Sequence, residues 1–215
     1  MPRSKFRQAG VLAGVMLCGL AGCTQALFTA AYLIRGTNDP PEFDGLREKR
    51  VVVVCRAPAT MNPDHALATE ALARRLSQLL RRRVSDIQVI PPEKVAKWTD
   101  EHSWDEFPEV GEALGAEMVV GIDLLDFSLY RSSTVYQGRA DIAVTVYDMT
   151  RDGEIVFEKA PLRVLYPSTG IPTTVPRAQF RRVVVNVIAE DIGKLFYPHD
   201  RTADFARDGT ALPYQ

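Results

Sequence analysis

Cysteine is scarce in this chain of 215 residues, and its three copies are unevenly placed. Cys18 and Cys23 lie in the apolar N-terminal segment, which leaves Cys55 as the single cysteine of the remaining sequence. A disulfide framework is therefore excluded beyond that segment. Cys55 directly follows four valines, so we interpret it as a small buried side chain in a strand; the alternative is a reactive thiol.

Neither sign of charge is in excess, because 26 Lys and Arg side chains face 27 Asp and Glu side chains. Without residues 1–22, which hold Arg3, Lys5 and Arg7, the net charge falls from −1 to −4. This balance gives no electrostatic reason to expect a nucleic acid as partner. The length that remains suits one domain of ordinary size with a tether and a tail.

Motifs that carry catalysis are missing from the sequence. It has no Gly-x-Ser-x-Gly nucleophile turn and no glycine-rich phosphate loop. Only three histidines occur, whereas a metal site needs several His, Cys or carboxylate ligands at workable spacing. The densest group of such residues is at 100–105, around His102, where acids also serve as helix caps. We predict a protein that is not an enzyme and has no metal or cofactor; the alternative is a periplasmic metal-dependent hydrolase that uses His102.

The first 23 residues have the layout of a secretory signal. Three basic residues and no acid precede a short apolar stretch at residues 9–22. The stretch ends in Leu20-Ala21-Gly22-Cys23, which resembles the lipobox of bacterial lipoproteins. The resemblance implies that residues 1–22 are removed and that Cys23 carries the lipid. We therefore predict a signal peptide at 1–22 and a lipidated anchor and linker at 23–48.

An alternative follows from the apolar residues beyond Cys23. Residues 9–34 are long enough to cross a bilayer as one uncleaved helix, which needs about 20 apolar residues. Both readings leave the basic N-terminus in the cytoplasm and the globular part on the periplasmic side. Position 24 is Thr rather than Asp, and by resemblance to proteobacterial sorting rules this favours the outer membrane over the inner one.

Beyond a linker rich in chain breakers at 35–48, the sequence predicts an α/β domain at 49–196 and a polar tail at 197–215. We expect a mixed sheet of about five strands with three to four helices. The first three strands should run parallel through helical crossovers, and the later ones should form an antiparallel meander. The expected strands are 51–56, 87–90, 118–130, 137–149 and 155–165, and the expected helices are 63–83, 93–99, 108–114 and 176–196.

Several local details complete this prediction. The spacing of apolar residues in helix 63–83 indicates a buried stripe that begins at Leu67. Its three final arginines, residues 81–83, suit a solvated helix end, with a basic binding patch as the alternative. Ser103 and Glu106 have the spacing of a capping box. Pro161 indicates an edge strand or a bulge, and residues 166–175 are expected to form a loop.

The stretch from Gly111 to Gly121, which leaves a helix by Gly-Ala and enters a strand, suggests a family. Together with the strand at 51–55 and the strand–turn–strand at 147–154, it resembles the periplasmic α/β lipoprotein domains typified by CsgG, LpoB and the N-terminal domain of TolB. The resemblance implies a domain that binds protein partners in the envelope and has no catalytic residues. CsgG also inserts into the membrane, but no pair of long alternating insertions occurs in this sequence.

Trp98 and Trp104 flank the same predicted helix junction. We favour core packing for both, and an exposed pair would instead be a partner-binding site. The sequence thus predicts a membrane-tethered lipoprotein that serves as a non-catalytic interaction or accessory module of an envelope complex for transport, secretion or cell-wall assembly. A membrane-inserted oligomeric secretion component is a further alternative, and the oligomeric state is left open.

Overall fold

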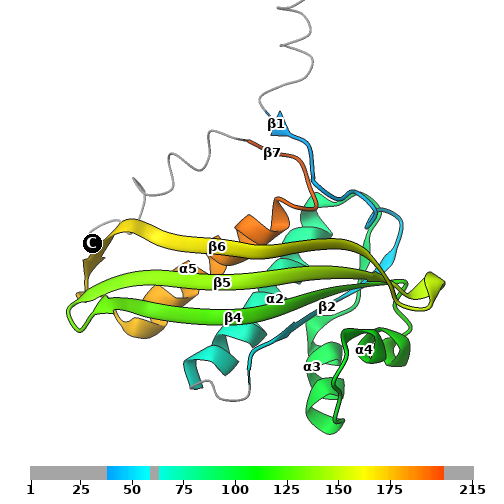
Figure 1. Cartoon of the computed structure of the whole chain (residues 1–215), viewed down its shortest axis with the longest axis horizontal. Coiled ribbons are helices and arrows are strands. Elements are labelled where there is room, and N and C mark those ends of the chain that lie inside the picture. Colours follow the sequence, from blue (N-terminus) through cyan, green and yellow to red (C-terminus); the bar gives the residue numbers. More distant parts are fainter. Residues whose placement is uncertain (1–37, 59–62, 201–215) are drawn as a thin grey trace, which may run out of the picture. The chain divides into compact units, whose positions relative to one another are not determined.

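The computed structural model describes residues 38–58 and 63–200. Within them, five strands form a mixed sheet in the order β3-β2-β4-β5-β6, and four helices pack on it (Figure 1). Strands β1 (Asn38–Asp39) and β7 (His199–Asp200) pair separately as a two-stranded sheet. The strands of the main sheet are β2 (Arg50–Arg56), β3 (Gln88–Val89), β4 (Met118–Ser132), β5 (Val135–Asp148) and β6 (Glu154–Pro172), and the helices are α2 (Pro63–Arg83), α3 (Pro92–Glu101), α4 (Phe107–Leu114) and α5 (Arg177–Gly193).

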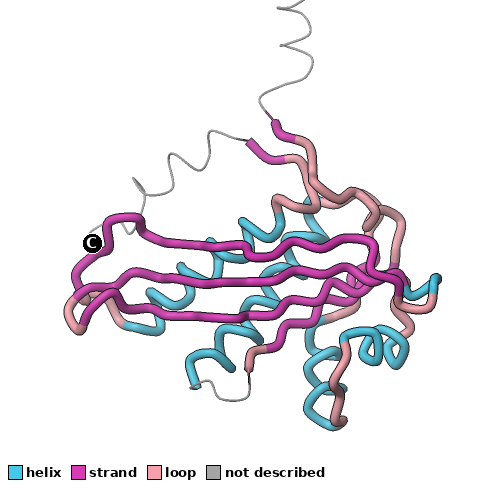
Figure 2. Tube along the Cα trace, viewed as in Figure 1, coloured by secondary structure: helices cyan, strands magenta, loops and turns pink. Residues whose placement is uncertain are grey.

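The strand directions agree with the predicted α/β fold. Strand β2 pairs in parallel with β3 on one side and with β4 on the other. Strands β4, β5 and β6 follow one another as an antiparallel meander, in which the chain runs back and forth (Figure 2). Parallel neighbours require crossover connections, and α2 and the α3–α4 pair supply them. Four successive buried valines in β2 fit a strand that is covered on both faces.

Each face of the sheet has its own hydrophobic core. The larger core lies between the sheet and helices α2 and α5, and its largest fully buried side chains include Leu72, Leu76, Ile142 and Phe180. The smaller core lies under α3 and α4, where Phe107 and Val110 pack on valines of β2 and β4. Helices α3 and α4 reach only one end of the second face (Figure 1), and the outward residues of β5 and β6 are half-buried or exposed.

Three local predictions were wrong. The buried stripe of α2 does not begin at Leu67, which is 49% exposed, because the neighbouring Ala68 faces the core instead. The capping box is formed by Glu106 and Glu109, not by Ser103 and Glu106, since α4 begins at Phe107. Residues 166–175 are not all loop, because β6 continues to Pro172.

The packed domain also begins earlier than the predicted linker boundary at 48. Leu46 is fully buried, and Phe43 lies 5.4 Å from the ring of Phe157. The backbone N–H of Phe43 donates to the carbonyl of Leu195 at 2.9 Å. At the other boundary, Tyr197 is buried although the tail was expected to begin there. The described part of the linker therefore contributes apolar contacts to the core.

The turn between β5 and β6 depends on the buried carboxylate of Asp148. It accepts hydrogen bonds from the Thr150 hydroxyl at 2.6 Å, the Thr150 N–H at 2.9 Å and the Arg151 Nε at 2.9 Å. These donors, first the Thr150 hydroxyl and then Arg151, hold the pKa of Asp148 below its usual value. Asp148 thus caps the short 3-10 helix η1 (Met149–Arg151) that starts the turn.

We expect Asp148→Asn to lower the free energy of unfolding by about 1–2 kcal/mol at neutral pH, the usual worth of a charged cap. Because the folded-state pKa is depressed, the carboxylate stabilises the fold above its unfolded-state pKa of about 4. This contribution disappears as the pH falls through the folded-state pKa, so the two proteins should converge in acid. Denaturant titrations across pH test this. Asp152→Asn, in the same turn but exposed, is the control, and an equal loss there would contradict the assignment.

Candidate functional site

The candidate site lies where the connections of the sheet change direction. From β2 the chain crosses through α2 to β3 on one side, and from β3 it crosses through α3 and α4 to β4 on the other side. In open α/β sheets, such a switch point opens a crevice at the carboxyl ends of the strands. Here the carboxyl end of β2, residues 53–55, forms the floor of a groove of about 490 Å³.

The groove is walled by small apolar side chains and rimmed by polar ones. Helix α2 contributes one wall and α3 the other, and Trp104 follows α3. On the rim formed by α2, Glu70 and Arg74 form an ion pair one helical turn apart. The lining comprises Val53, Val54, Cys55, Ala66, Thr69, Glu70, Ala73, Arg74, Pro92, Val95, Ala96, Thr99, Asp100 and Trp104.

Arg56, at the end of β2 next to the groove, contacts residues of β4, of α4 and of the segment between α3 and α4. Its Nε donates to the Oδ1 atom of Asp123 on β4, and its Nη1 donates to the carbonyl of Asp105 between α3 and α4. The same guanidinium lies 4.4 Å from the ring centre of Phe107, in cation–π geometry. One side chain therefore joins β2, β4 and α4. The hydrogen bond to Asp123 raises the pKa of Arg56 above its ordinary value.

The two predicted tryptophans are both half-buried and lie in different surroundings. Trp104 lines the groove, and its ring centre lies 5.9 Å from that of Phe107. Trp98 stacks on His102 with ring centres 4.8 Å apart and planes 6° apart. Both also pack against the smaller core, so packing and partial exposure coexist at these positions.

His102 contacts a residue of its own helix, Trp98, rather than a cluster of possible metal ligands. Its Nδ1 lies 2.9 Å from the carbonyl oxygen of Trp98, one turn earlier in α3. Among residues 38–58 and 63–200, no three His, Cys, Asp or Glu side chains are grouped so that they could hold a metal ion. The acids around His102 instead include the helix cap at Glu106, whose N–H donates to the Glu109 carboxylate at 2.9 Å.

Cys55 lines the groove and is half-buried rather than fully buried. Burial and, to a lesser degree, the negative charge of Asp123 raise its pKa far above the usual range. Because the thiolate is the reactive form, such a thiol is a poor nucleophile. Tyr147, which packs on the smaller core on the other face of the sheet, also has a raised pKa, first through burial and then through the charges of Asp123 and Glu106. Neither group is prepared for acid–base chemistry near neutral pH.

No protein-family model matches this sequence, and no curated protein matches it either. Three solved structures illustrate the similarity that is found. The PelC dodecamer from Paraburkholderia phytofirmans is 16% identical, with a TM-score of 0.46 over 74% of this chain and 94% of that chain. Lipoprotein GNA1162 from Neisseria meningitidis is 11% identical, with a TM-score of 0.41 over 66% of this chain and 95% of that one.

A minor lipoprotein from Acinetobacter baumannii is 15% identical, with a TM-score of 0.36 over 68% of this chain and 91% of that one. Bacterial lipoproteins are thus among the solved structures that this chain is similar to. At these identities and TM-scores, the likeness carries no conclusion about activity, assembly or partner.

The predicted anchor residue Cys23 and the signal at 1–22 lie outside the described residues. In the part of the chain that is described, none of the helices is both long and apolar enough to cross a membrane. Sequence reasoning found Trp104 but missed Arg56, Asp123 and Phe107. The available signal was a charged residue directly after each of two apolar runs, Arg56 after residues 51–55 and Asp123 after residues 118–122.

Proposed function

We propose that this protein is a lipid-anchored, non-catalytic interaction module of the bacterial cell envelope. Acyl chains on Cys23 would hold it at the membrane, with the domain facing the periplasm, and Thr24 favours the outer membrane. The lipobox-like Leu20-Ala21-Gly22-Cys23 supports the anchor. The observation that carries the interaction role is the groove of about 490 Å³ with the half-buried Trp104 in its lining.

The surroundings of Trp104 fit a protein partner. A tryptophan beside a concave, partly apolar surface is the residue type that most often dominates protein–protein binding energy. The segment 92–117, which contains α3 and α4, holds eight acids and only two lysines. An acidic segment of this kind beside the groove speeds association with a basic surface and disfavours acidic ones. We therefore expect a partner that inserts an apolar side chain and surrounds it with Lys or Arg.

Site-specific photo-crosslinking in cells tests this proposal. A photoreactive amino acid at Asp100, an exposed residue of the groove, should give one discrete crosslinked protein. The same probe at Asn186, which is exposed on α5, is the matched control and should not give that product. Adding Trp104→Ala should lower the Asp100 product at least tenfold, because a hot-spot side chain is worth about 2 kcal/mol or more.

Two outcomes would contradict the proposal. Equal products from positions 100 and 186 would mean that the groove is not the contact surface. An unchanged yield with Trp104→Ala, while circular dichroism shows that the variant is folded, would remove the tryptophan from the contact. A product made of two copies of this chain would identify the partner as the protein itself rather than another envelope component.

A further inference from the structure

Charge is distributed very unevenly over the domain. The part of the meander beyond the row that joins Phe127, Ala140 and Val164, taken with the start of α5 that follows it, comprises residues 127–140 and 164–182. This part, which we name the arginine end, contains five arginines and no acidic residue. Its arginines are Arg131, Arg139, Arg177, Arg181 and Arg182. The chain as a whole has a net charge of −1, so this concentration is local.

The arginines belong to three elements and lie on both faces of the sheet. Helix α5 packs on the face of the larger core, whereas Arg139 alternates with the core residue Ala140 and so lies on the opposite face. Arg131 is near the end of β4, Arg139 is in β5, and the other three belong to the first two turns of α5. The first turn of α5 has no acid, and its N-cap residue Pro176 makes no side-chain capping bond. Acids rather than arginines stabilise the positive end of a helix dipole. The sequence of this helix start is therefore unfavourable for folding alone and favourable for attracting an anion.

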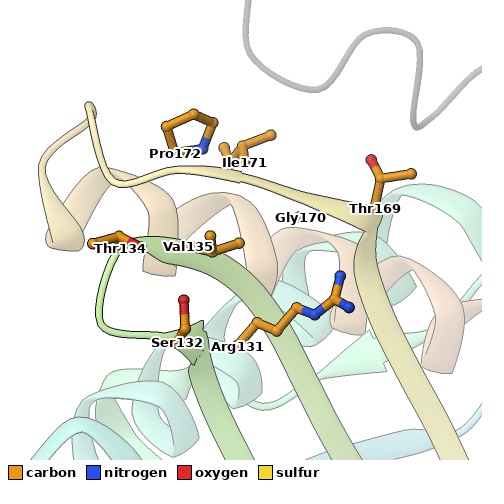
Figure 3. Close-up of a pocket in the computed structure, with 8 residues that line it drawn as sticks. All are labelled: Arg131, Ser132, Thr134, Val135, Thr169, Gly170, Ile171 and Pro172. Atoms are coloured by element: carbon orange, nitrogen blue, oxygen red, sulfur yellow. The ribbon is translucent and has the colours of Figure 1, made fainter.

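The tip of the arginine end is hollowed. A pocket of about 360 Å³ lies between the β4–β5 turn and the last residues of β6 (Figure 3). Its lining includes one arginine and three residues with hydroxyl groups, which are Arg131, Ser132, Thr134 and Thr169. Gly170, with φ of +75°, forms part of the wall, where a Cβ would approach Val135 to 2.8 Å. Guanidinium and hydroxyl donors are the groups that bind phosphate oxygens in proteins.

We infer that the arginine end docks on the anionic phospholipid headgroups of the membrane to which the protein is tethered. This inference rests on the proposed anchor at Cys23. Residues 24–39 span at most about 55 Å when extended, so the tether keeps the domain close to the bilayer. Clusters of basic residues next to a membrane anchor bind anionic lipid surfaces, and an acyl anchor makes that contact intramolecular. The arginine end is thus a second, electrostatic contact with the membrane.

The test uses the acylated full-length chain in vesicles. Ser133, an exposed residue of the β4–β5 turn, is replaced by Cys and labelled with a fluorophore in a Cys55→Ala background. A quencher attached to lipid headgroups then reports how close the turn lies to the membrane. In vesicles with about 30% anionic phospholipid, we expect quenching at least threefold stronger than in neutral vesicles. Salt at about 0.5 M, where charges are screened within a few ångströms, should remove the difference.

The control variants have matched charge changes. Arg131→Gln, Arg139→Gln and Arg182→Gln together should abolish the dependence on anionic lipid. Arg82→Gln, Lys94→Gln and Lys97→Gln remove three exposed basic residues elsewhere and should keep it. Equal quenching in neutral and anionic vesicles, or an equal effect of both variants, would overturn the inference. Loss of the difference on adding inorganic phosphate or glycerol phosphate at millimolar level would assign the pocket to a free phosphate instead.

Failure of the anchor can be told apart from failure of this inference. Mass spectrometry of the purified protein reports whether Cys23 is acylated, before any vesicle is made. An acylated protein whose labelled turn ignores anionic lipid contradicts the docking of the arginine end and leaves the proposed anchor in place. A protein without acyl chains contradicts the anchor, and therefore the tether on which this inference depends.

Discussion

Replacing Cys23 with Ala is expected to abolish maturation of the protein completely. The sulfur of Cys23 would carry the lipid, and alanine offers no atom to acylate. Because cleavage before position 23 depends on that modification in lipoproteins, the variant should accumulate as the full-length precursor. Intact-mass measurement of protein from membranes distinguishes the two forms. The wild-type chain should begin at an acylated Cys23, and the variant should retain residues 1–22 without added lipid.

The other cysteines provide matched controls for this experiment. Cys18→Ala changes the same apolar segment, and Cys55→Ala changes the groove, so both should mature normally. A wild-type chain that keeps Met1 and carries no lipid would instead favour residues 9–34 as an uncleaved transmembrane anchor. Maturation in all three variants would mean that no single cysteine of the chain is required for it, which would contradict the assignment of Cys23.

The helices and strands of the domain were predictable because local signals agreed with one another. The Pro63 start and the apolar spacing of residues 63–83 gave α2 within one residue at each end. A dense apolar run that turns to alternation gave most of β4, and alternating apolar residues gave most of β5. The extension of β6 was missed because Pro167 and Gly170 are residues that usually interrupt strands. In the structure they lie in a bulge between Tyr166 and Ile171, after which pairing with β5 resumes.

The candidate site was only partly predictable, because its geometry depends on the pairing of strands that are far apart in the sequence. Arg56 and Asp123 are 67 residues apart in sequence, and they meet because parallel pairing of β2 and β4 places them opposite each other. No local sequence pattern indicates which residues of β2 and β4 lie opposite each other. Trp104 could be singled out by residue type, but not its place in the groove, which depends on how α3 and α4 cover the second face of the sheet.

Phe107 is the largest fully buried side chain in the core of this second face. Its side chain is 1% exposed and lies between Arg56, Trp104 and Tyr147. Beneath the ring, β4 has Gly121, where a Cβ would approach the ring to 2.7 Å. The glycine therefore provides the space that the phenylalanine fills. Deleting the ring would leave a cavity between α4 and the sheet that a glycine cannot fill.

We expect Phe107→Ala to lower the free energy of unfolding by about 3–5 kcal/mol, as for other large core truncations. Phe107→Leu keeps most of the volume and should cost less than about 1.5 kcal/mol. Denaturant titration of the acylated chain in detergent measures both. Trp104 should gain solvent exposure in the alanine variant, seen as a red shift of tryptophan emission, because it loses a ring neighbour. A loss under about 1 kcal/mol for Phe107→Ala would mean that α4 is held to the sheet by Arg56 and the smaller contacts instead.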